Sequence, residues 1–201
     1  MILIKHRRNT IDQLKETPTK YGIEVDIRSF GEKLIINHDP FANGEFFENW
    51  ISFYKHQTLI LNVKEEGLEK QLIDLMKSYK IEDYFFLDQS FPFLVKYAKN
   101  GESRCAVRVS EFESVETALT LAGKIDWIWV DCFTKFPLNN KTATQLKNAG
   151  FKLCLVSPEL HGRDAKTEIN QFAQILNEQN ISPDAICTKF PELWEKLVNE
   201  I

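Results

Sequence analysis

Short apolar runs alternate with longer amphipathic segments from one end of the chain to the other. The apolar runs are short and rich in β-branched and aromatic residues, which is typical of buried strands. They cover residues 2–5, 22–28, 58–64, 84–89, 104–110, 127–132, 151–157 and 184–190. A further extended piece, residues 33–38, follows the second of these strands.

Amphipathic segments with helical spacing lie between the strands. The clearest covers residues 68–79, where Leu68, Leu72, Leu75 and Met76 fall on one face. Similar patterns predict helices over residues 142–150, 165–180 and 191–200.

Strands that alternate with helices are the signature of a parallel α/β fold, and eight strands point to a (β/α)8 barrel, the TIM barrel. We expect one compact domain over residues 1–201, with short loops and the extra extended segment after the second strand. A doubly wound open sheet is the main rival. No Gly-rich loop follows the first strand, which weakens the nucleotide-binding form of that rival.

Composition narrows the functional classes. The 201 residues are 43% hydrophobic and 27% charged, and the net charge is -4, so the chain offers no basic surface for nucleic acid. An anionic substrate must therefore meet a local cluster of Arg, Lys or metal. No apolar run approaches the ~20 residues of a membrane span. The four scattered cysteines form neither a zinc motif nor a disulfide framework, and signal-peptide features are absent, so we expect a reduced, cytoplasmic protein.

Titratable residues stand on the second predicted strand. Alternation places Glu24, Asp26 and Arg28 on one face, which in a barrel lines the interior near the carboxyl-terminal opening. Carboxylates two positions apart, roughly 6 to 7 Å at the backbone, can converge on one divalent cation. Mg²⁺ and Ca²⁺ favour such oxygen ligands. The alternative is a structural ion network in which Arg28 and a neighbouring Lys balance the two acids.

Other strand ends add groups that suit an anionic substrate. His6 and His38 both end extended segments at the same predicted opening, as a general acid and a general base would. Arg7, Lys64 and Arg108 could hold a phosphate by charge-assisted hydrogen bonds. The same face also carries Asn62, Asp131 and Lys189.

Several of these residues occur in an ordered set of motifs. The set is His6-Arg7, Asn9-Thr10, Glu24-x-Asp26, His38-Asp39-Pro40 and Asn62-Val63-Lys64, followed by DQSF (88–91) and AICTKFPE (185–192). It resembles the glycerophosphodiester phosphodiesterase family, whose pattern is H-R-G, E-N-T, E-x-D, H-D and E-x-K, with Q-S-F and a closing T-D-x-P segment. The resemblance spans nearly the whole chain.

The resemblance implies a TIM barrel that hydrolyses a small-molecule phosphodiester with a bound divalent metal, Mg²⁺ or Ca²⁺. On the matching positions, Glu24 and Asp26 would be metal ligands and His6 and His38 the acid and base. Arg7 and Lys64 would hold the phosphate. Lipid metabolism, cell-envelope synthesis and scavenging all stay open as biological settings.

Three departures from the family pattern change the expectation. Asn62 stands where the family has its third carboxylate ligand, so metal affinity should fall unless Asp131 or Asp88 contributes. The first motifs are contracted to HRRNT, with Arg8 in place of Glu. The segment between Asp39 and Leu59 is short, which predicts an open active site and a substrate other than simple glycerol diesters.

Other interpretations stay open at this point. The same fold could let a substrate hydroxyl attack and release a cyclic phosphate, as the related phospholipase D toxins do. A catalytically inactive barrel could bind a phosphorylated ligand. In the loop over residues 156–163, Glu159, His161 and Arg163 could contact a substrate or could simply be solvated. The aromatic residues of 46–54 favour core packing over self-association, and the oligomeric state is undecided.

Overall fold

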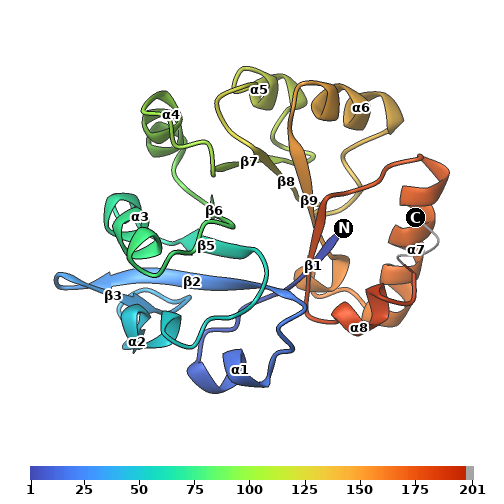
Figure 1. The fold of residues 1–201 in the computed structure, drawn as a ribbon. Helices are drawn as coiled ribbons and strands as arrows, with labels where there is room; N and C mark the ends of the chain where they lie inside the picture. Colours follow the sequence, from blue (N-terminus) through green and yellow to red (C-terminus); the bar gives the residue numbers. More distant parts are fainter. Residues whose placement is uncertain (198–201) are drawn as a thin grey trace.

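The computed structural model describes residues 1–197, in which strands and helices alternate (Figure 1). The strands are β1 (Ile2–Lys5), β2 (Gly22–Phe30), β3 (Lys33–Ile36), β4 (Glu45–Phe46), β5 (Leu59–Val63), β6 (Tyr84–Leu87), β7 (Ala106–Val109), β8 (Trp127–Val130), β9 (Lys152–Val156) and β10 (Ala185–Thr188). The helices are α1 (Ile11–Glu16), α2 (Phe47–Ile51), α3 (Glu69–Ser78), α4 (Phe91–Lys99), α5 (Val115–Leu119), α6 (Asn140–Asn148), η1 (Pro158–His161), α7 (Ala165–Glu178) and α8 (Pro191–Trp194).

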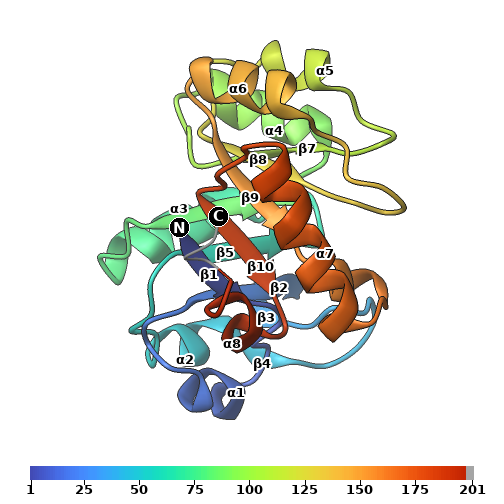
Figure 2. The ribbon, with the colours of Figure 1, turned by 90° about the vertical axis from the view of Figure 1, so that its right-hand side faces the viewer.

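The strands form one curled sheet with helices around its outside (Figures 1 and 2). Within residues 1–197, all strands except β3 and β4 run parallel, and a helix follows each parallel strand before the next begins. From β1 the pairing runs through β2 and β5 to β6 in one direction, and through β10, β9 and β8 to β7 in the other. Between β6 and β7 the ladder is a single bridge, Phe86 to Cys105. We call this junction the seam.

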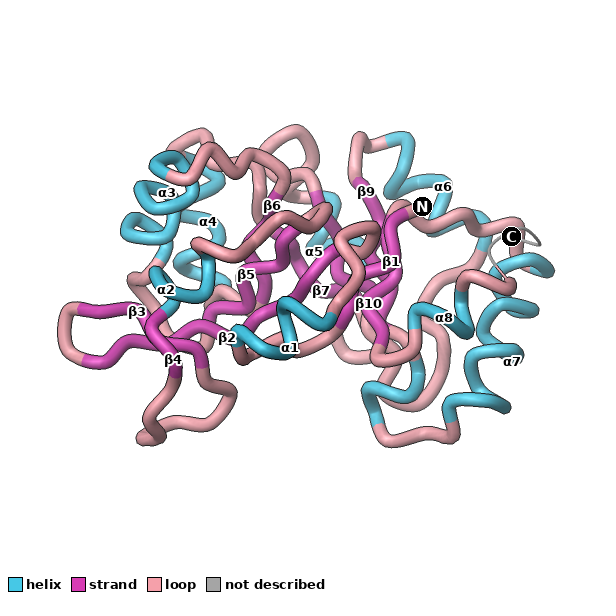
Figure 3. Tube along the Cα trace, turned by 60° about the horizontal axis from the view of Figure 1, so that its bottom comes forward, coloured by secondary structure: helices cyan, strands magenta, loops and turns pink. Residues whose placement is uncertain are grey.

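The curled α/β sheet agrees with the predicted architecture, while closure into a complete barrel depends on the seam. Every predicted strand is present, with ends that differ by at most two residues. The extra extended segment is β3, which pairs antiparallel with the outer half of β2. This hairpin projects beyond the rest of the sheet (Figure 3). The predicted helix over 191–200 is shorter, Pro191–Trp194, and its residues 198–200 lie outside the described range.

Side chains on β2 alternate between two environments, as the sequence pattern predicts. Ile23, Val25 and Ile27 pack in the large core between the sheet and the helices. Glu24 and Asp26 face the interior of the curl, and both are fully buried. Below them, a second apolar cluster fills the interior, with Phe85 and Trp127 stacked at 4.6 Å among its members. The interior is therefore apolar at one end and charged at the carboxyl ends of the strands, an opening that we call the mouth.

Two further expectations concern surfaces. Phe47 and Trp50 in α2 are fully buried, which fits core packing of the aromatic segment. Its neighbours Phe46 and Phe53 are partly exposed. In residues 1–197, no helix combines the length and the apolar character needed to cross a membrane. All four cysteines are buried free thiols.

Candidate active site

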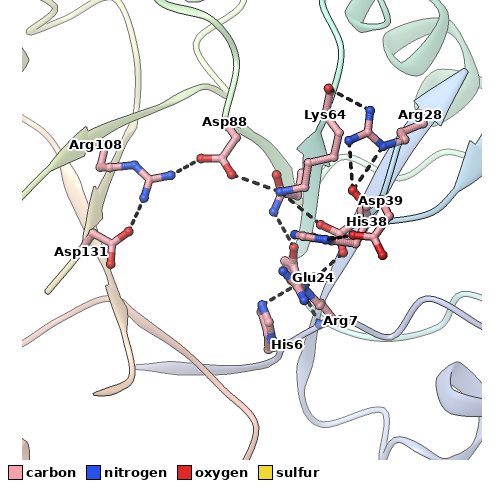
Figure 4. Close-up of polar contacts among 12 residues, drawn as sticks. His6, Arg7, Glu24, Arg28, His38, Asp39, Lys64, Asp88, Arg108 and Asp131 are labelled. Atoms are coloured by element: carbon pink, nitrogen blue, oxygen red, sulfur yellow. Dashed lines mark hydrogen bonds and ion pairs between the residues drawn. The ribbon is translucent and has the colours of Figure 1, made fainter. Parts of the chain in front are cut away.

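The mouth gathers most of the predicted site residues on neighbouring strands. Asp26 on β2 lies beside Asn62 on β5 in the parallel register, which brings two elements distant in sequence together. Lys64 follows β5, Arg108 lies on β7, and Asp131 follows β8. Figure 4 shows charged side chains from these strands pointing toward one another.

Glu24 is held by donors from two directions. Its Oε2 accepts the backbone N–H of Arg7 at 2.7 Å, and its Oε1 accepts the side-chain amide of Asn62 at 2.7 Å. Arg7 has a positive φ of 49°, an uncommon conformation for a residue with a side chain, in the segment that brings its N–H to the carboxylate. Burial, followed by the charge of Asp26, raises the pKa of Glu24 to about 7. The buried acid pair is thus an unfavourable arrangement that positive charge nearby relieves.

Asp26 receives that positive charge from Arg7 and Lys64. Its oxygens lie 3.3 Å from Arg7 Nε and 3.3 Å from Lys64 Nζ. The side chain of Asn9 donates to Asp26 at 2.9 Å and accepts the Asp26 backbone N–H at 3.1 Å. Asn9 belongs to one of the sequence motifs, but its two hydrogen bonds to Asp26 were not predicted.

Arg28 does not balance the acid pair, so this part of the ion-network alternative was wrong. Its guanidinium donates to the carbonyl oxygen of His38 at 3.0 Å and to Glu65 at 3.3 Å. The reason is that Arg28 lies beyond the last pair of β2 with β5, Ile27 with Val63, at a level where β2 pairs with β3, Arg28 opposite Ile35.

His6 lies against Glu24 with one ring nitrogen available. Its Nε2 is 3.7 Å from Glu24 Oε2, and its buried Nδ1 has no hydrogen-bond partner among the described residues. Burial, followed by the charges of Arg7, Lys189 and Lys64, lowers the pKa of His6 to about 3. A neutral imidazole in this position can accept a proton.

His38 lies on the loop after β3 and is more exposed than His6. Its Nδ1 lies 2.8 Å from Asp39, and the exposed fraction of its side chain is 43%. The hydrogen bond from His38, with smaller contributions from the charges of Arg7 and Arg28, lowers the pKa of Asp39. Arg28 fixes the backbone of His38, while the imidazole stays accessible to solvent.

A chain of alternating charges crosses the mouth from Lys64, after β5, to Asp131, after β8 (Figure 4). Lys64 Nζ lies 3.3 Å from Asp88, Asp88 pairs with Arg108, and Arg108 pairs with Asp131. Asp131 also contacts His161 at the end of η1. Asp131 therefore has two cationic or hydrogen-bonding partners on the far side of the mouth, away from its predicted place among metal ligands. We call this set of residues, from Lys64 to His161, the charge chain.

The loop over residues 156–163 divides into structural and site residues. Glu159 is buried and accepts hydrogen bonds from Ser157, from the Thr188 hydroxyl at 2.6 Å and from the Lys189 N–H at 2.9 Å. Arg163 donates to backbone carbonyls of residues 132 and 133. Glu159 and Arg163 thus fasten loops together, and His161 is the residue of this loop that joins the charge chain.

The oxygen atoms near Glu24 determine which ion the site could hold. Asn62 Oδ1 is buried and accepts no hydrogen bond from the described residues, and the buried Asp26 Oδ1 lies 3.3 Å from Lys64 Nζ. Within residues 1–197, no three His, Cys, Asp or Glu side chains are grouped as a metal site. A metal would therefore need Asn62 beside the two carboxylates. Three oxygen donors with two negative charges suit a hard divalent cation better than a thiophilic one.

Comparison with known proteins gives a result at the level of structure. No protein-family model matches the chain, and no curated protein matches it. A solved glycerophosphodiester phosphodiesterase from Agrobacterium tumefaciens str. C58 is similar over 98% of this chain and 99% of its own, with a TM-score of 0.69 and 14% identity. A glycerophosphoryl diester phosphodiesterase from Parabacteroides distasonis ATCC 8503 is similar over 98% of this chain and 86% of its own, with a TM-score of 0.67 and 13% identity. The chain therefore has the fold of these solved phosphodiesterases along nearly its whole length.

Proposed function

We propose that the chain is a phosphoric diester hydrolase whose active site is the mouth. The observation that carries the proposal is the buried Glu24–Asp26 pair, with Arg7, Lys64 and His6 in contact with it. The phosphodiesterase fold of the solved structures supports this choice. For the same reason we take the curled sheet to be a (β/α)8 barrel that closes at the seam.

The side chains divide the work between binding and proton transfer. Arg7 and Lys64 supply positive charge for the phosphate, and Arg108 extends that charge across the mouth. His6, a neutral imidazole that lies against Glu24, is the proposed acceptor of the proton from the attacking hydroxyl group. His38, oriented by Asp39 and open to solvent, donates a proton to the leaving alcohol.

We further propose that Glu24, Asp26 and the Asn62 side-chain oxygen hold a divalent cation, Mg²⁺ or Ca²⁺. The buried Asn62 Oδ1, which accepts no hydrogen bond from the described residues, and a carboxylate with a raised pKa support this choice. When bound, the cation would supply Lewis-acid polarisation of the phosphoryl oxygens. Asp131 is left out of this set because it lies across the mouth from Glu24, paired with Arg108 and His161 (Figure 4).

The test is hydrolysis of a panel of phosphodiesters with Mg²⁺, Mn²⁺ or Ca²⁺ and with chelator, for the wild type and Asp26→Asn. We expect metal-dependent turnover that falls by at least about 100-fold in the variant, which corresponds to roughly 2.7 kcal/mol in the barrier. Product analysis distinguishes a free phosphomonoester from a cyclic phosphate. Turnover that is equal in Asp26→Asn and wild type would overturn the proposal. Binding of phosphate without turnover on any diester would favour an inactive barrel.

A further inference from the structure

A cleft of about 670 Å³ opens at the mouth between α4 and α5. Its lining includes Leu87, Leu94, Ala106 and Val107, each no more than 5% exposed, which form an apolar floor. The cleft lies at the seam, where the single bridge between β6 and β7 leaves the two following helices apart. Its volume falls in the range of ligand sites, about 300 to 1,000 Å³.

The rim of the cleft carries two phenylalanines that contact water extensively. Phe91 at the start of α4 is 48% exposed, and Phe112 in the loop before α5 is 79% exposed. Both line the cleft together with its floor. Exposed aromatic rings beside a buried apolar floor are a surface that gains free energy when an apolar group covers it.

The cleft is continuous with the proposed active site. Asp88 and Arg108 line the cleft and are also members of the charge chain that begins at Lys64. A ligand with its phosphate at Lys64 and Arg108 would therefore extend one of its substituents into the cleft.

The charges of the cleft disfavour a cationic substituent. Asp88 is paired with Lys64 and Arg108. Glu113 accepts the Ser110 hydroxyl at 2.6 Å and lies 3.8 Å from Arg108. Both carboxylates thus already have partners. The lining also includes Gln89, whose buried Oε1 has no hydrogen-bond partner among the described residues, and beside it lies the apolar surface of the floor and rim. A small polar alcohol such as glycerol would leave the apolar surface of the floor and rim in contact with water.

We propose that the cleft binds an apolar alcohol group of the substrate, an alkyl or aryl chain esterified to the phosphate. This inference rests on the proposed function in taking the ligand to be the substrate. Binding to the cleft can be tested without any turnover. Each methylene that is buried should tighten binding by roughly a factor of four.

Calorimetric binding of butyl, hexyl and octyl phosphate, with glycerol 3-phosphate as the polar control, tests the inference. We expect affinity to rise with chain length for the wild type. Thr117→Trp places a large ring in the cleft from the exposed face of α5 and should abolish that rise, while glycerol 3-phosphate binds unchanged. Thr120→Trp is the matched control, because Thr120 is exposed near the end of the same helix and is not part of the cleft lining. Phe112→Ser, a change at an exposed position, should weaken octyl phosphate at least about tenfold, since an aromatic ring contributes on the order of two buried methylenes.

Affinities independent of chain length in the wild type, or the same loss in both Trp variants, would overturn the inference. The two proposals fail separately. Chain-length-dependent binding without hydrolysis of any diester removes the proposed function and keeps the cleft. Hydrolysis at the mouth with equal affinity for polar and apolar alcohols removes the cleft and keeps the function.

Discussion

At the scale of single residues, Asn62 has the largest effect on the chemistry of the mouth. Its amide donates to Glu24 at 2.7 Å, a contact that a carboxylate at this position could not make. A neutral residue here lowers the repulsion among buried acids, and it also lowers the negative charge available to a cation. Asn62 therefore gives Glu24 a hydrogen-bond donor that does not depend on a bound ion.

Asn62→Glu tests this balance. In chelator, we expect the variant to lose about 1–3 kcal/mol of unfolding free energy, because Glu24 loses a buried donor and gains a negative neighbour. Added Ca²⁺ or Mn²⁺ should raise its melting temperature more than that of the wild type. Asn62→Gln, which keeps the amide at the length of Glu, is the control. A melting temperature of Asn62→Glu that changes with neither Ca²⁺ nor Mn²⁺ would contradict the proposed cation site.

The sequence could not predict which side chains contact one another in the site. Alternation along β2 places Glu24 and Asp26 on the inner face, and their contacts with Asn62 and Lys64 agree with that prediction. The identity of the balancing cations depends on how neighbouring strands are paired. Arg28 has the right spacing, but it lies where β2 pairs with β3 and does not contact the acid pair. Arg7 instead contacts Asp26 from the loop after β1.

At the scale of elements, loops at the mouth are fastened to one another by carboxylates. Glu111, after β7, accepts the backbone N–H groups of Phe133 at 3.1 Å and Lys135 at 2.6 Å, and that of Thr134 between them. Burial acts to raise the pKa of Glu111, but the backbone donors of Lys135 and Thr134 outweigh it and lower the pKa to about 2. The loop after β8 thus depends on an ionised side chain from the loop after β7.

This arrangement gives a pH dependence with a definite sign. Because the folded pKa of Glu111 lies below its ordinary value of 4.5, its stabilisation is complete above that pH and is lost as pH falls toward about 2. We expect amide protection at residues 134 and 135, corrected for intrinsic exchange, to fall over that window. In Glu111→Gln, protection should be lower at pH 6 and nearly flat with pH. Identical dependence of amide protection on pH in the wild type and Glu111→Gln would show that Glu111 does not hold the loop after β8.

Helices long enough for the apolar spacing to repeat were predictable from the sequence, and shorter helices were not. Helix α7 has 14 residues and α3 has 10, enough for the apolar spacing to repeat. The five-residue α5 has barely more than one turn, so no period can be read from it. Antiparallel pairing of β3 with β2 was also beyond reach, because a short apolar run does not specify its partner strand.

At the scale of the whole molecule, the parallel strands form one continuous paired series, from β6 through β5, β2, β1, β10, β9 and β8 to β7, and its two ends meet at the seam. Phe86 donates its backbone N–H to Arg104 at 2.8 Å, whereas β2 and β5 are joined over five residue pairs. Local opening at the seam breaks fewer hydrogen bonds than opening between β2 and β5.

Native-state hydrogen exchange should reveal this difference. We expect the amides of β6 and β7 at the seam to exchange through a lower-energy opening than those of β2 and β5. Octyl phosphate, if it fills the adjacent cleft, should slow exchange at the seam and leave β2 unchanged. Equal protection of the amides in β6, β7, β2 and β5 would show that helix packing, and not strand pairing, sets the stability of the seam.

The four interior thiols have a practical consequence for work on this protein. Burial raises the pKa of Cys105, Cys132, Cys154 and Cys187, so the reactive thiolate is scarcely populated while the chain is folded. Maleimides and peroxides should therefore find no fast-reacting sulfur in the native state. A single cysteine introduced on the rim of the mouth would accept a dye or spin label selectively, with the natural four left in place.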